Sequence, residues 1–373
     1  MDGGTRHGVS FRRLRDGNEQ QGNSSQAIPG TDGKWWWLRP PSTIGKDRRS
    51  TGPRHVPARA MAQSISGDVV SSGESLVQPL LSIVVICHNM VREAPRTLHS
   101  LSRRYQRGIE DLEYEVIVVD NGSSRPLAEA QVREFGPEFR YVFFPTASPS
   151  PVAAINAAVD ASTGSHVVTC IDGARILSPG MLRFIALAIR LSPRPVIGSL
   201  AWHLGSKVQK VSMLEGYNQE AEDRLLADSG WLEDGYRLFS VACLANSSGK
   251  GWFRSISECN CICLSRGMYD ELGGFDERFV LAGGGYANLD FYKRACELPG
   301  AQLITLLGEG TFHQFHGGAA TNARPESHPG KRFADEYRGL RGMPYAKPEQ
   351  LPIYLGSLPK QAVPFLRQSA EQA

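Results

Sequence analysis

Three polar segments stand directly after buried apolar runs, where a parallel sheet would present them to a ligand. They are His88-Asn89 after residues 80–87, Asp120 at the end of 114–120, and Asp172 after 166–171. The carboxyl ends of parallel strands meet at one edge of an open α/β sheet, and ligands bind at that edge. A carboxylate such as Asp172 can hold a divalent cation there against phosphate oxygens. The same Asp-Gly pair is also typical of a plain turn.

Alternating strand and helix patterns along residues 80–307 must position these side chains. Apolar runs predict strands at 80–87, 114–120, 141–144, 166–171, 195–203, 258–265 and 303–307. Amphipathic periodicity predicts helices at 94–105, 152–161, 179–190, 220–226 and 288–297, and residues 308–318 read as a loop after the last strand. Such alternation indicates βαβ units. We therefore expect an α/β fold with a mostly parallel central sheet flanked by helices.

Composition divides the chain of 373 residues into three parts. Residues 1–78 are rich in Gly, Ser, Arg, Gln and Pro and are predicted to form a disordered basic tail, because they hold too little apolar surface to order themselves. Met61 is an alternative start of the protein. Residues 79–324 are the predicted folded domain. The Pro-interrupted residues 325–373 are expected to wrap over its surface.

Charge and cysteine usage exclude several classes of protein. The net charge is +3, and the basic excess lies in the tail, so the folded part is slightly acidic and unsuited to binding nucleic acid. No apolar run reaches the ~20 residues of a transmembrane segment, and no signal peptide is recognisable. Seven cysteines without metal-binding spacing indicate free thiols in a reducing compartment, so a cytoplasmic location is expected.

Five segments resemble, in order, the signature segments of the family 2 glycosyltransferases. They are VVICHN (84–89), VVDNGSS (118–124), AINAAVDASTG (154–164), IDGA (171–174), and GGFDERF (273–279) followed by NLDFYKRA (288–295). The resemblance covers about residues 80–318 and implies a Rossmann-like GT-A fold. It also implies inverting transfer of a sugar from a nucleotide-diphosphosugar donor, usually of the UDP type, to a glycan or other hydroxyl acceptor. Polysaccharide biosynthesis is the acceptor pathway that the family suggests.

The resemblance assigns a role to each matched position. The residues that it places at the nucleotide sugar are Cys87, His88, Asn89, Asp120, Asn121, Asn156, Asp172 and Gly173. Among these, Asp120 is expected to bind the base or ribose. Asp172 matches the first acid of the family's Asp-x-Asp metal motif.

The metal motif departs from the family pattern, because Ala174 replaces its second acid. A histidine after the last strand serves as a metal ligand in several GT-A enzymes, so His313 is the predicted partner of Asp172. Imidazole suits Mn²⁺ better than Mg²⁺, and Mn²⁺ is the favoured cofactor. His316 is expected to contribute less. The alternative is that both histidines merely pack on Phe312 and Phe315.

The segment that carries the family's catalytic base also departs from the family pattern, because Ala287-Asn288 replaces its acid pair. Asp290 in the same helix or Glu258 before the strand 258–265 is the predicted replacement. A carboxylate in the first turn of a helix, such as Asp290, can instead serve only to stabilise that helix. The alternative function is therefore a degenerate GT-A protein that binds a nucleotide sugar or glycan without turnover.

Overall fold

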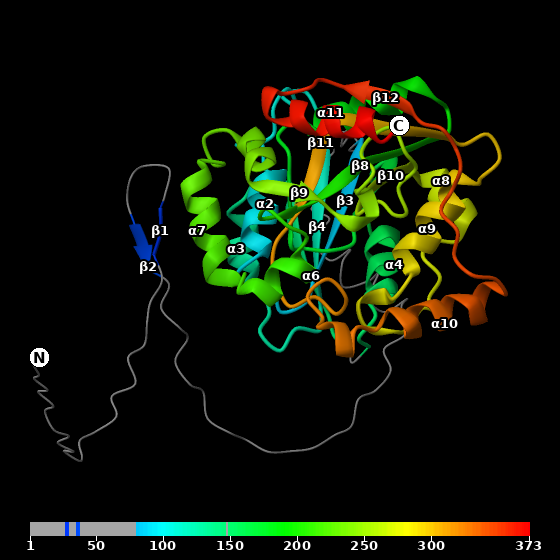
Figure 1. Ribbon diagram of the computed structural model, residues 1–373, viewed down its shortest axis with the longest axis horizontal. Coiled ribbons are helices and arrows are strands. Elements are labelled where there is room, and N and C mark those ends of the chain that lie inside the picture. The colour runs from blue at the N-terminus through cyan, green and yellow to red at the C-terminus, as the bar shows by residue number, and fades with distance from the viewer. Residues whose placement is uncertain (1–26, 30–34, 38–79, 147) are drawn as a thin grey trace, which may run out of the picture. The chain divides into compact units, whose positions relative to one another are not determined.

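The computed structural model describes residues 27–29, 35–37, 80–146 and 148–373 (Figure 1). The chain divides into two units, residues 1–55 and 56–373. In the first unit, the short strands β1 (Ala27–Pro29) and β2 (Trp35–Trp37) pair antiparallel. The rest of the predicted disordered tail, with Met61, lies outside the described residues.

Four parallel strands form one half of the central sheet in the second unit. They are β5 (Phe139–Phe144), β4 (Tyr114–Asn121), β3 (Leu81–Cys87) and β6 (His166–Cys170), in that spatial order. Alternate residues of β3 point to opposite faces, so Ile83 and Val85 join one apolar cluster while Val84 and Ile86 join the other. Burial on both faces explains why these strands read as continuous apolar runs.

The other half of the sheet mixes directions. β10 (Cys261–Ser265) pairs antiparallel with both β6 and β8 (Pro195–Leu204), whereas β11 (Gln302–His313) and the edge strand β12 (Ile353–Gly356) continue parallel from β8. Two short strands, β7 (Arg175–Leu177) and β9 (Ala242–Leu244), pair antiparallel with β11 and β8. The predicted mostly parallel sheet is confirmed.

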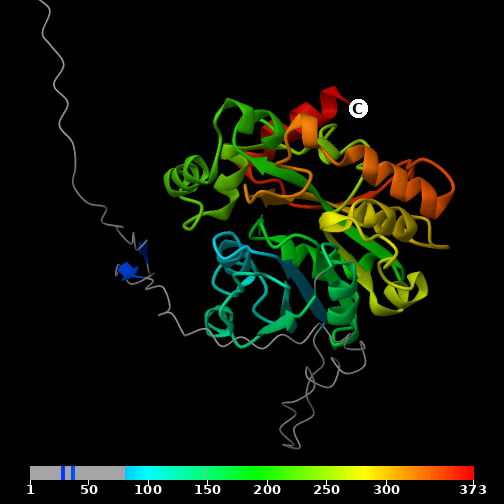
Figure 2. The same ribbon diagram turned by 90° about the horizontal axis from the view of Figure 1, so that it is seen from below.

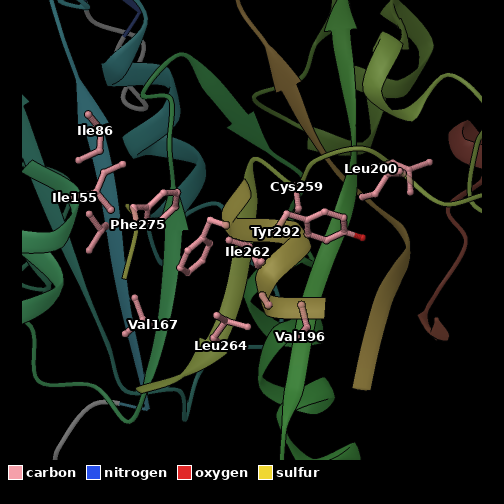
Figure 3. Close-up of a cluster of buried hydrophobic side chains, with 14 of the residues drawn as sticks. Ile86, Ile155, Val167, Val196, Leu200, Cys259, Ile262, Leu264, Phe275 and Tyr292 are labelled. Atoms are coloured by element: carbon pink, nitrogen blue, oxygen red, sulfur yellow. The ribbon is translucent and has the colours of Figure 1, made fainter. Parts of the chain in front are cut away.

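Helices cover both faces of this sheet (Figures 1 and 2). One face carries α2 (Ala94–Leu101), α3 (Glu129–Arg133) and α5 (Met181–Ala188). The opposite face carries α4 (Val152–Asp160), α8 (Arg266–Leu272) and α9 (Ala287–Cys296). Figure 3 shows the cluster on this second face, in which Ile155 of α4 and Tyr292 of α9 join side chains of β3, β6, β10 and β8.

Two regions of the fold differ from the predictions. The expected loop 308–318 is strand as far as His313. The register of β11 shifts between Thr305 and Gly310, a stretch that includes Gly308 with φ +80°, and β11 then continues and pairs with β7. The C-terminal residues do more than wrap the surface. β12 extends the sheet, and Phe365 of α11 (Val363–Glu371) packs on Trp202 in the core.

Three further helices complete the second unit. They are α6 (Gln209–Ser212), α7 (Gln219–Ser229) and α10 (Gly330–Arg341). Two of them, α6 and α7, contact His313 and Phe315 at the end of β11. Within the described part of the chain, no helix is long and apolar enough to cross a membrane.

Candidate metal and nucleotide-sugar site

Asp172, His313 and His316 meet at the carboxyl end of β6. Their potential ligand atoms all lie within 4.8 Å of one another. His313 Nε2 is 3.1 Å from Asp172 Oδ2, and His316 Nε2 is 3.7 Å from Asp172 Oδ1 and 3.2 Å from His313 Nε2. Two imidazole nitrogens and one carboxylate converge on one point, which is a donor set suited to a divalent transition metal such as Mn²⁺.

Local geometry fixes Asp172 at this point. The chain turns directly after β6, and Asp172 Oδ1 accepts from the backbone N–H of Ala174 (3.0 Å). The neighbouring N–H of Gly173 donates to the carbonyl oxygen of Ile86 (2.7 Å), which ties the turn to β3. A Cβ atom at Gly173 would lie 2.5 Å from Cys87 Sγ, so only glycine fits this close approach of the two strand ends.

The electrostatics of the cluster suit a metal ligand set. Burial raises the pKa of Asp172, but the charge of His316 outweighs it and holds that pKa well below its usual range. Burial lowers the pKa of His313 to about 4 against the opposing effect of Asp172. At neutral pH the site therefore presents an ionised carboxylate and a neutral imidazole, the forms that bind cations.

Arg175 adds a buried positive charge beside the cluster. It lies on β7 directly opposite His313, and its Nε is 3.4 Å from Asp172 Oδ2. The residue is only 7% exposed, and its Nε and Nη1 have no hydrogen-bond partner among the described residues. A buried guanidinium whose N–H donors lack acceptors lowers the folding stability, and a bound anion would supply those acceptors. The sequence analysis missed Arg175, although a lone Arg in the apolar stretch after Asp172 was a usable signal.

The predicted base-binding residues lie together at the ends of β3 and β4. Asn89 adopts a left-handed backbone conformation, with φ 53°, and its side-chain oxygen accepts from the backbone N–H of Arg125 (3.1 Å). His88 Nδ1–H donates to the carbonyl oxygen of Asn121 (2.9 Å). His88 and Asn89 are exposed, whereas Cys87 is buried beneath them. The edge predicted from strand order is therefore present.

Asp120 is placed at this edge, but its carboxylate organises its own loop. One oxygen accepts from the backbone N–H of Ser123 (2.9 Å) and the other from that of Leu127 (3.2 Å). The side chain is 1% exposed. Its role in binding the base stays a prediction, and the structure adds a structural role that its position in the sequence did not reveal.

Asn156 lies apart from these residues, against the turn that follows α8. Its Oδ1 accepts from Phe275 N–H (3.0 Å) and from the Tyr269 hydroxyl (2.8 Å), while its Nδ2 donates to the Phe275 carbonyl (2.9 Å) and to Glu277 (3.1 Å). Because its amide is fully engaged within the protein, the expected contact with the nucleotide sugar has no geometric support. Asn156 clamps the Gly273–Arg278 turn.

Asp290 and Glu258, the two predicted bases, differ sharply in their surroundings. Asp290 is buried, and its oxygens accept from Arg294 Nε (2.7 Å) and from Arg341 Nε and Nη2 (2.5 and 2.7 Å). Both carboxylate oxygens thus accept hydrogen bonds from guanidinium groups. These contacts favour a structural role for Asp290 over a role as catalytic base. Glu258 is half-buried and, among the described residues, its only hydrogen bond is from Asn288 Nδ2 (3.1 Å).

Strand register brings Glu258 to the same sheet edge as Asp172. Cys261, the first residue of β10, pairs antiparallel with Cys170, the last residue of β6. Residues before Cys261 therefore extend past the same edge as residues after Cys170. Asn288, which occupies the position of a family acid, donates a hydrogen bond to Glu258, so Glu258 lies beside α9, and its role as the base stays a prediction.

Comparison with known proteins supports the resemblance predicted from the sequence. Residues 82–233 match the model of "Glycosyl transferase family 2". The match covers less than half of the chain, and over that part the predicted resemblance to this family is confirmed. The helix-flanked, mostly parallel sheet confirms the predicted α/β fold class.

Individual relatives are distant. The chain is 26% identical over 247 residues to validoxylamine A glucosyltransferase of Streptomyces hygroscopicus subsp. jinggangensis, an alignment that covers 59% of this chain and 53% of the relative. The chain thus spans about half the length of the curated relatives it matches. Similar solved structures include S. aureus TarS 1–349 (15% identity, 63% of this chain and 60% of that one, TM-score 0.42). Another is the mannosyltransferase PcManGT from Pyrobaculum calidifontis in complex with GDP-Man and Mn²⁺ (15% identity, 83% and 75%, TM-score 0.42).

Proposed function

We propose that this protein is a family 2 glycosyltransferase that transfers a hexosyl group from a nucleotide-diphosphate donor, with inversion, in a reaction assisted by a divalent cation. The observation that carries the proposal is the convergence of Asp172, His313 and His316 at the ligand-binding edge of the sheet. The missing second acid of the metal motif is offset by two imidazoles. The names of the curated relatives support a hexosyl donor.

The leaving diphosphate is the main electrostatic problem of this reaction. Asp172, His313 and His316 would hold a cation, which would supply positive charge against the diphosphate as its bond to the sugar breaks. Arg175 is buried beside Asp172, and its Nε and Nη1 donors, which no described residue accepts from, could serve the same oxygens. Mn²⁺ is preferred to Mg²⁺ because two of the three ligands are nitrogen.

The acceptor hydroxyl needs a base, and Glu258 is the better of the two candidates. In the transfer step, the hydroxyl oxygen forms a bond to the anomeric carbon, the bond from that carbon to the diphosphate breaks, and the hydroxyl proton moves to the carboxylate. Asn288 orients Glu258 through one oxygen and leaves the other for the proton. A base facing the side opposite to the leaving group gives inversion.

A transfer assay tests the proposal. Purified protein is given nucleotide-activated hexoses, uridine and guanosine types in turn, with Mn²⁺, and release of nucleoside diphosphate is followed. Turnover that is lost on chelation, in Asp172→Ala and in Glu258→Gln supports the proposal. Tight donor binding with no turnover for any donor, or turnover that survives chelation, contradicts it.

A further inference from the structure

We infer that Gln209 is a positioning residue for the metal site: it sets the tautomer and the direction of His313. The inference rests on the proposed metal-assisted function and adds to it a residue from a part of the chain outside the five matched segments. Gln209 is the first residue of α6 and is fully buried.

The orientation of the Gln209 amide follows from its neighbours. Its Nε2 lies 2.9 Å from the backbone carbonyl oxygen of His313, which can only accept a hydrogen bond. The amide oxygen must therefore be the atom 2.8 Å from His313 Nδ1. Asn322 Nδ2 donates to the same oxygen (3.2 Å), which agrees with this assignment.

This assignment determines the state of the imidazole. Because Gln209 Oε1 accepts, Nδ1 of His313 carries the proton, and in the neutral ring Nε2 then has a free lone pair. That Nε2 is the atom that faces Asp172 and His316. Since Gln209 holds both the ring and the backbone of His313, rotation of the ring away from the cluster would break its hydrogen bond.

A hydrogen bond to the neighbouring strand β8 fixes the position of Gln209. Its backbone N–H donates to Nδ1 of His203 (2.9 Å), and His203 lies directly opposite His313 on β8. The contact ties the start of α6 to the strand next to β11. A hydrogen-bond partner on the far nitrogen of a ligating histidine typically changes metal affinity 10–100-fold when it is removed. The segment after β8 therefore contributes to cation binding without supplying a ligand.

The test compares Gln209→Met with Gln106→Leu. Met is similar in size but cannot accept from Nδ1–H. Gln106 is the matched control, because it is also buried and fully hydrogen-bonded, to Ser100 O, Ser178 O and Leu182 N–H, but has no hydrogen bond to His313. Mn²⁺ affinity is measured by electron paramagnetic resonance on full-length protein, with folding checked by circular dichroism.

We expect the Mn²⁺ dissociation constant to rise about 10–100-fold in Gln209→Met and to stay unchanged in Gln106→Leu. Gln209→Glu, which keeps an acceptor for Nδ1–H, should bind Mn²⁺ more tightly than Gln209→Met. Nitrogen-15 NMR of the wild type should show His313 protonated at Nδ1. If Gln209→Met folds and binds Mn²⁺ like the wild type, or if His313 is protonated at Nε2, the inference is wrong. If the wild type binds no Mn²⁺ and no other divalent cation, the proposed metal function fails instead.

Discussion

Replacing Asp290 separates a structural carboxylate from a catalytic one. Asp290→Asn keeps the shape of the side chain but removes the charge that faces Arg294 and Arg341. We expect a loss of folding stability with retained turnover per folded molecule, because both carboxylate oxygens are already taken up by the two guanidinium groups.

The size of the loss follows from burial. Removing one partner of a buried ion pair costs about 3–5 kcal/mol, because the remaining charge is left uncompensated. The side chains of Arg294 and Arg341 are 25% and 20% exposed, so water can partly solvate them and the lower end, about 3 kcal/mol, applies. At about 2–4 °C per kcal/mol for a large domain, the thermal midpoint should fall by about 6–12 °C.

The assay is thermal unfolding followed by circular dichroism, with initial rates measured well below the midpoint. The control is Glu258→Gln, whose half-buried side chain can still accept from Asn288 and should leave the midpoint nearly unchanged while turnover is lost. The reasoning is refuted if Asp290→Asn keeps the wild-type midpoint and abolishes turnover, since Asp290 would then be the base.

Three further expectations follow from the site and its surroundings. His313→Ala and His316→Ala should both weaken Mn²⁺ binding in calorimetry, since both Nε2 atoms face Asp172; wild-type affinity in His316→Ala would restore the smaller role expected from the sequence. Arg175→Gln should weaken binding of a nucleoside diphosphate about tenfold or more but leave binding of the nucleoside unchanged, and an equal effect on both ligands would contradict a phosphate contact. Burial raises the pKa of Glu309 to about 7, against hydrogen bonds from Ser178 and Tyr236, so its contribution to stability should be present below about pH 4.5 and be lost as the pH rises to about 7. Denaturant unfolding of wild type and Glu309→Gln should therefore show the wild type losing stability relative to the variant between pH 5 and 8, and a constant difference would be evidence against this shift.

Sequence reasoning succeeded where local pattern and strand order determine position. Apolar runs gave the strands of the sheet, and the parallel arrangement placed Asn89, Asp120 and Asp172 at one edge. Sequence reasoning failed where contacts between residues far apart in the chain determine the role of a side chain. Nothing in the sequence indicated that Arg341, far along the chain, would neutralise Asp290, or that Gln209 would bond to His313.

The position of His313 shows the same limit in a single residue. Glycines on both sides predicted a loop, but Gly308 lies within a register shift of a continuing strand, and His313 is fixed by pairing with Arg175 on β7. A pattern of residue types cannot distinguish these two uses of glycine. His313 is therefore held by strand pairing, not by the folding-back loop that the sequence suggested.

The most direct test of the metal-assisted mechanism is anomalous diffraction at the manganese edge from crystals soaked with Mn²⁺ and uridine diphosphate. We predict an anomalous peak bounded by Asp172, His313 and His316, with the diphosphate beside Arg175. An ordered diphosphate at this sheet edge with no manganese peak among the three side chains would contradict the account.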